Sequence, residues 1–91
     1  MATPEAIAYV IQGLPSSDFD KPEEDVEDIK SDFMEKLADV EETIEERDFE
    51  RAIEHLQETR NFTYDQIIDT TTREEIIAMI NSLTAYLENF L

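Results

Sequence analysis

An apolar side chain recurs at every third or fourth position across the middle of the chain, and this pattern constrains the fold more than any other feature. The positions are Val26, Ile29, Phe33, Leu37, Val40 and Ile44. Steps of three and four residues place them on one side of an α-helix about five turns long. The pattern predicts a helix that begins at Pro22, ends near Arg47 and carries mostly charged residues on its other sides.

An amphipathic helix of this kind has to bury its apolar side, and the flanking sequence supplies three further helical segments. A short first helix is predicted over residues 4–12. Thr3 is its N-cap, Pro4 occupies its first position, and Gly13, the only glycine, follows its end. The connector that follows contains Leu14 and Phe19, which we expect to pin it to the core.

The second half of the chain predicts two more helices. Asp48 is the expected N-cap of a helix that begins at Phe49 and continues to about Ile68, either unbroken or divided near Asn61. The run 70–72 consists of three threonines and is predicted to be a break, with Thr72 and Glu75 forming the capping box of the last helix. The apolar face of that helix is made by Ile76, Ile77, Ile80, Leu83, Leu87 and Phe90.

Four amphipathic segments with short links predict an all-α fold. We expect a small antiparallel helical bundle of about four helices, the first one short, in a single domain that spans residues 1–91. One glycine and three prolines leave few places for the turns of a many-stranded sheet. Because the bundle supplies its own partners for the long apolar face, we expect a monomer or a weak homodimer.

The charge balance excludes several classes of function. The chain has 24 acidic and 7 basic residues, a formal net charge of −17, no cysteine and one histidine. Phosphate contacts need Lys and Arg, so we expect no direct nucleic-acid binding, and no apolar run is long enough for membrane insertion. The absence of cysteine excludes disulfides and thiolate chemistry. We therefore predict no catalytic, cofactor-binding or metal-binding residues, and no cofactor.

Two features nevertheless come closest to a chemical site. His55 is the one side chain that titrates near neutral pH, but it has no nucleophile motif near it, and we expect it on the helix surface beside Glu54 and Glu58. The segment 18–20 reads Asp-Phe-Asp and offers oxygen ligands for calcium, yet it lacks the spacing of an EF-hand. Aromatic residues at helical spacing are expected mainly in the core, with Phe90 and Leu91 as the best candidates for an exposed apolar contact.

Several strings resemble a small helical module of archaeal and some bacterial surface and secreted proteins, which often lies near the C-terminus beside PKD-type repeats. The resemblance covers residues 11–88. It is carried by Ile11-Gln12-Gly13-Leu14-Pro15, by Asp48-Phe49 with Ala52-Ile53, by Ile68-Asp69, and by Ala85-Tyr86-Leu87. Arg47-Asp48 departs from the family, in which glycine is common at this turn. The resemblance implies a non-catalytic spacer or interaction module.

Two functional hypotheses follow. The first is a non-catalytic accessory or interaction module of a larger surface or extracellular protein, whose partners are another protein or flanking domains of the same polypeptide. The alternative is a small acidic cytosolic inhibitor of phage type, which mimics nucleic acid and blocks a basic protein groove. Residues 1–5 have no signal-peptide character, so we expect a cell-surface location for an excised module and a cytoplasmic one for a complete chain. An enzyme has no support beyond generic carboxylates.

Overall fold

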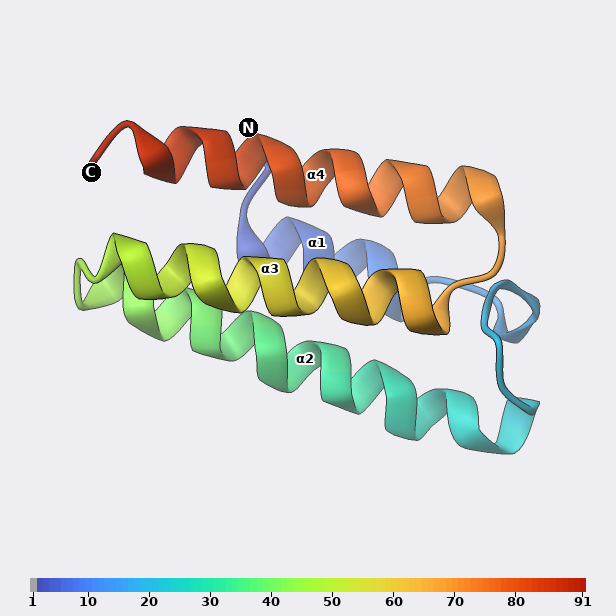
Figure 1. The fold of residues 1–91 in the computed structure, drawn as a ribbon. Helices are drawn as coiled ribbons and strands as arrows, with labels where there is room; N and C mark the ends of the chain where they lie inside the picture. Colours follow the sequence, from blue (N-terminus) through green and yellow to red (C-terminus); the bar gives the residue numbers. More distant parts are fainter. Residues whose placement is uncertain (1) are drawn as a thin grey trace.

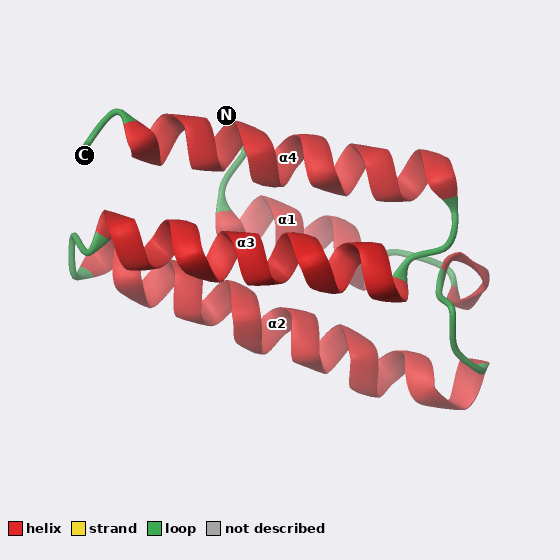
Figure 2. Ribbon diagram, in the orientation of Figure 1, coloured by secondary structure: helices red, strands yellow, loops and turns green. Residues whose placement is uncertain are grey.

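The protein is an all-α bundle of four helices. A computed structural model describes residues 2–91, and the helices are α1 (Pro4–Gln12), α2 (Glu23–Glu45), α3 (Phe49–Gln66) and α4 (Thr70–Glu88). A single 3₁₀ turn, η1 (Ser16–Asp18), interrupts the connector between α1 and α2. Figure 2 shows that short loops join α2 to α3 and α3 to α4, and no strand is assigned within residues 2–91. The predicted fold class is confirmed.

The three long helices run antiparallel to their chain neighbours, and α1 lies behind α3 (Figure 1). α2 packs on α3, and α3 packs on α4, while α1 contacts both α2 and α4. The bundle measures 39 × 22 × 18 Å. Because α1 is short, it accompanies only part of the length of its neighbours (Figure 1). None of the helices in the described part of the chain is both long and apolar enough to cross a bilayer.

The core follows the predicted apolar positions closely. Its fully buried side chains come from all four helices and from the loop between α3 and α4; they include Ile7, Ile11, Phe33, Val40, Leu56, Ile67, Ile76 and Leu87. In α2 the predicted positions from Val26 to Val40 are buried, but Ile44 is half-buried and its neighbour Thr43 is buried instead. The Thr43 hydroxyl is satisfied inside the helix, where it donates to the carbonyl of Asp39 at 2.9 Å.

Capping side chains fix three helix starts. The Thr3 hydroxyl accepts a hydrogen bond from the Ala6 amide at 3.1 Å, and the Asp48 carboxylate accepts one from the Arg51 amide at 3.3 Å. Both caps confirm the prediction. At α4 the predicted capping box is wrong, because Asp69 is the N-cap and its carboxylate accepts from the Thr72 amide at 3.0 Å. The threonine run is therefore the first turn of α4 and not a break.

Arg47 makes the turn between α2 and α3 in the left-handed conformation, with φ of 61°. The Asp48 amide donates to the Thr43 carbonyl at 2.9 Å, and the Arg47 amide donates to the Ile44 carbonyl at 3.0 Å. These two bonds make a Schellman motif, in which glycine is the usual left-handed residue. An arginine at this position carries a backbone cost that glycine avoids.

The connector before α2 is tied to the junction between α3 and α4. Phe19 and Ile67 form an isolated antiparallel bridge, in which the Asp20 amide donates to the Gln66 carbonyl at 2.8 Å. The Ile68 amide donates to the Asp18 carbonyl at 2.9 Å. This pairing ends α3 at Gln66, two residues before the predicted end, and α3 is continuous through Asn61. Phe19 is buried and Leu14 packs on the core, as expected of anchors.

Candidate functional site

The strongest surface feature is a row of exposed carboxylates along α2. Eleven of the 24 acidic residues lie in α2, whereas α4 carries three. Seven exposed acidic residues recur in steps of three and four along one side of α2 and its C-cap. We call them the acidic stripe: Glu24, Asp28, Asp32, Glu35, Asp39, Glu42 and Glu46. Their period is that of the apolar positions on the same helix, so the stripe follows one side of the helix for its whole length.

Four of the seven Lys and Arg side chains contact aromatic rings or carbonyl oxygens instead of these carboxylates. The Lys30 ammonium donates to the carbonyls of Gln12 and Leu14 at 3.0 and 2.8 Å. Lys36 lies 4.8 Å from the centre of the Phe62 ring.

Two arginines of the second half of the chain behave similarly. Arg73 lies 5.8 Å from the centre of the Tyr64 ring, and Arg60 donates to the Asn81 side-chain oxygen at 3.2 Å. Within residues 2–91 the one ion pair within 4.0 Å joins His55 and Glu58, with Nδ1 and Oε2 3.7 Å apart. In the described part of the chain, no carboxylate of the acidic stripe therefore has a basic group within 4.0 Å.

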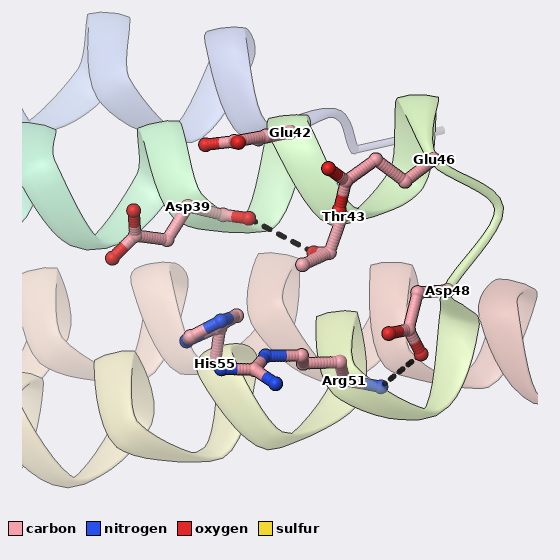
Figure 3. Close-up of a pocket in the computed structure, with 7 residues that line it drawn as sticks. All are labelled: Asp39, Glu42, Thr43, Glu46, Asp48, Arg51 and His55. Carbon is pink, nitrogen blue, oxygen red and sulfur yellow. Dashed lines mark hydrogen bonds between the residues drawn. The ribbon is translucent and has the colours of Figure 1, made fainter.

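A groove of about 340 Å³ lies where the C-terminal end of the acidic stripe faces α3 (Figure 3). Its lining comes from α2, from the turn after it and from the first turns of α3: Asp39, Glu42, Thr43, Glu46, Asp48, Arg51 and His55. Figure 3 shows the Arg51 and His55 side chains on the α3 side, across from the acidic residues of α2. Four carboxylates thus share the groove with one guanidinium and one imidazole.

Hydrogen bonds inside the groove hold its backbone and leave the stripe carboxylates open. The two bonds drawn in Figure 3 join the Thr43 hydroxyl to the Asp39 carbonyl and the Arg51 amide to the Asp48 carboxylate. Neither uses the carboxylate of a stripe residue. Such a groove is suited to bind the cationic side chains of another molecule, since multiple carboxylates can accept from one guanidinium or ammonium group.

His55 lies partly inside this groove and not simply on the helix surface as predicted. Its side chain is 21% exposed, and its partner is Glu58 of the same helix. Nothing in the described residues provides it with a nucleophile at hydrogen-bond distance. No group of three or more His, Asp or Glu side chains within residues 2–91 is arranged to hold a metal ion.

The segment that offered oxygen ligands for calcium has a structural use. The Asp18 carboxylate accepts a hydrogen bond from the Thr72 hydroxyl at 3.0 Å, and the Asp18 carbonyl accepts from the Ile68 amide. Asp18 thereby joins the first connector to the start of α4.

Within residues 2–91, two carboxyl groups have a clearly displaced pKa. The negative charge of Glu5 raises the pKa of Glu41 above its usual value, and Glu45 adds to this effect. The hydrogen bond from the Thr72 backbone amide, with a smaller contribution from the nearby Thr72 side chain, lowers the pKa of Asp69. The pKa of Glu41 is raised because carboxyl groups of α1 and α2 lie close together. The pKa of Asp69 is lowered because its carboxylate caps α4.

Half of the eight aromatic side chains are less buried than the helical spacing suggested, and Phe49 and Phe62 pack against the core. Phe19 and Phe33 belong to the core, whereas Tyr9, Tyr64 and Tyr86 are exposed. Phe90 and Leu91 are 50% and 71% exposed, as predicted, and Phe90 lies beyond the end of α4 instead of on its buried apolar face.

Comparison of the chain with protein-family models, with curated proteins and with solved structures found no match. The resemblance to surface-protein modules therefore stays a prediction.

Proposed function

We propose that the chain is a non-catalytic interaction module, an accessory part of a larger surface or extracellular protein. One observation carries the proposal: the acidic stripe is exposed and has no Lys or Arg partner within residues 2–91. Uncompensated carboxylates on a rigid helix attract basic surfaces over a distance and keep a module soluble. The partner is accordingly a protein with a basic surface, or a basic flanking domain of the same polypeptide.

Two charge-matched variants test whether the stripe, and not net charge, does the binding. The stripe variant combines Asp28→Asn, Asp32→Asn, Glu35→Gln and Glu42→Gln. The control variant combines Glu54→Gln, Asp65→Asn, Glu74→Gln and Glu75→Gln, all exposed positions on α3 and α4. Each loses four negative charges, which takes the formal net charge from −17 to −13.

The ligand for this test is a synthetic arginine-rich peptide, with its Kd measured by calorimetry at low ionic strength. We expect the stripe variant to bind at least about tenfold more weakly than the control variant, which is about 1.4 kcal/mol. Equal Kd values for the two variants would overturn the proposal, because net charge alone would then explain binding.

The context of the module is tested by the mass of the polypeptide in its native source. An accessory module of a surface protein is found inside a longer, exported chain. A free polypeptide of the mass of this chain, 10.6 kDa, found in the cytoplasm would contradict this part of the proposal.

One further observation favours the alternative function, mimicry of nucleic acid. A formal charge of −17 along a bundle 39 Å long is one net charge per about 2.3 Å, close to the one charge per about 1.7 Å of duplex DNA. A rod with this charge density competes for a basic groove by the same electrostatics as a duplex. An inhibitor of this kind would act on a DNA- or RNA-binding protein without binding nucleic acid itself.

Displacement of a labelled DNA duplex from a histone-fold dimer tests the mimic. The expected result is displacement at low salt that weakens steeply as salt rises, with the stripe variant less effective than the control variant. If no DNA is displaced at low salt, mimicry of nucleic acid is contradicted, but the proposal of an accessory module is not.

A further inference from the structure

A second surface lies at the end of the bundle where α2 turns into α3 and where α4 ends. Three aromatic rings meet there. The rings of Phe49 and Phe90 stack with centroids 4.7 Å apart, and the Tyr86 ring meets Phe90 edge-on at 5.3 Å. We call Phe49, Tyr86 and Phe90 the end cluster. Tyr86 and Phe90 remain 41% and 50% exposed, so an ordered aromatic group is open at the surface of a very acidic protein.

The end cluster borders a cleft of about 260 Å³. Ile44 of α2 and Leu87 of α4 contribute its aliphatic lining, and Glu45 and Arg47 contribute its charged lining. This is the end of the bundle that α1 does not accompany (Figure 1). The three long helices alone therefore form this end of the bundle (Figure 1).

The carboxyl groups beside the cleft determine what kind of segment suits it. Glu45 lines the cleft, and Glu41 lies one helical turn before it. Glu5 of α1 is close enough to Glu41 to raise its pKa, and none of the three carboxyl groups has a basic partner within residues 2–91. Negatively charged carboxylates held this close together favour the binding of a cation beside them. Arg47 also lines the cleft, so cations are expected on the side of Glu41 and Glu45.

We propose that the end cluster and its cleft bind a basic amphipathic segment, which inserts an apolar side chain against Phe90 and places Lys or Arg beside Glu41 and Glu45. Charge complementarity decides between the possible occupants. A second copy of a chain with a net charge of −17 is repelled, as is an anionic membrane. Exposed aromatic residues that surround a pocket are the usual anchors of protein interfaces.

The inference rests on the proposed function in that the partner is basic, and it adds an apolar anchor that is separate from the acidic stripe. Two peptides of equal charge separate the two contributions. One is a synthetic amphipathic helix of leucine and lysine, and the other has glutamine in place of every leucine. The acidic stripe responds only to the charge that both peptides share, whereas the end cluster responds to leucine.

The test compares Phe90→Ser with the matched control Tyr64→Ser. Tyr64 is similarly exposed, at 56%, and lies toward the C-terminal end of α3, away from the end cluster. Wild type and Tyr64→Ser should bind the leucine peptide at least about tenfold more tightly than the glutamine peptide. Phe90→Ser should lose most of this preference. Phe90 lies after the end of α4, so its replacement leaves all four helices intact.

Equal preference for the leucine peptide in Phe90→Ser and Tyr64→Ser would overturn the inference. A dimer in sedimentation equilibrium that Phe90→Ser abolishes would also overturn it, since the occupant would then be a second copy. The stripe variant distinguishes this failure from that of the proposed function. If the stripe variant weakens both peptides while Phe90→Ser changes neither, the acidic stripe binds the partner without an apolar anchor.

Discussion

The ammonium group of Lys36 lies over the ring of Phe62, 4.8 Å from its centre, and not beside a carboxylate. The same ring meets Phe33 of the core edge-on, with centroids 4.7 Å apart. Phe62 thus connects a basic residue of α2 to the interior of the bundle. Because the lysine is held there, it neutralises none of the neighbouring acidic side chains within ion-pair distance. This arrangement is one reason why the acidic stripe remains uncompensated.

Replacement of Phe62 by leucine should lower the free energy of unfolding by about 1–2 kcal/mol, since it removes both the cation–π contact and the aromatic pair. Chemical denaturation of the variant gives this value. The matched control is Tyr9→Leu, which replaces an aromatic side chain that is 81% exposed. It should change stability by less than about 0.5 kcal/mol. Similar losses in both variants would show that the contacts of Phe62 have no special importance.

The buried side of α2 is tested by Leu37→Asp, at a side chain that is 2% exposed. An unpaired carboxylate at this position should cost several kcal/mol, on the order of the penalty for burying a charge. Ala38→Asp is the control, because it adds the same charge one residue later at an exposed position. Thermal unfolding measures both. If Leu37→Asp melts close to wild type, Leu37 does not lie in the core.

The turn between α2 and α3 offers a stabilising substitution. Arg47→Gly relieves the left-handed conformation of a residue with a Cβ atom, so it should raise the free energy of unfolding by up to about 1 kcal/mol. Arg47→Ala removes the same side chain but keeps the Cβ atom, and it should give no such gain. A loss of stability in Arg47→Gly would mean that the arginine side chain contributes more than its backbone conformation costs.

Asp69 gives a prediction about pH. Its pKa is lowered from 3.8 in the folded chain, mainly by the hydrogen bond from the Thr72 backbone amide, so its charged form stabilises the folded state. The contribution is present above the unfolded value and is lost as pH falls through the lower, folded pKa. Asp69→Asn keeps a capping side chain but cannot be charged. The melting temperature of wild type minus that of Asp69→Asn should therefore shrink as pH falls below 3.8. A difference that is constant down to acid pH would contradict this role.

The parts of the fold that depend on local sequence were predictable. The period of the apolar residues fixes the buried side of α2, and the side chains of Thr3 and Asp48 mark two helix starts, because each caps through residues within its own first turn. The start of α4 was not predictable in this way. Its threonines are poor helix formers, but Asp69 caps them, and Asp18 accepts from the hydroxyl of Thr72 across 54 positions of sequence.

The same distinction between local and long-range sequence information applies to the two candidate surfaces, the acidic stripe and the end cluster. The acidic stripe is present in the sequence as a period, since its steps repeat those of the apolar positions on the same helix. The end cluster is not, because Phe49 and Phe90 stand at the start of one helix and beyond the end of another. Only the antiparallel packing of α3 and α4 brings the two rings together. That packing fixes how the helix ends align, and no local pattern specifies it.

The acidic stripe as a binding surface is tested most directly by the salt dependence of the Kd for the arginine-rich peptide. Each carboxylate that pairs with the peptide displaces counterions, so the affinity falls as salt rises. The slope of log Kd against log salt should be steep for wild type and nearly as steep for the control variant, but clearly shallower for the stripe variant. If the two variants, equal in net charge, have the same slope, the stripe is not where the partner binds.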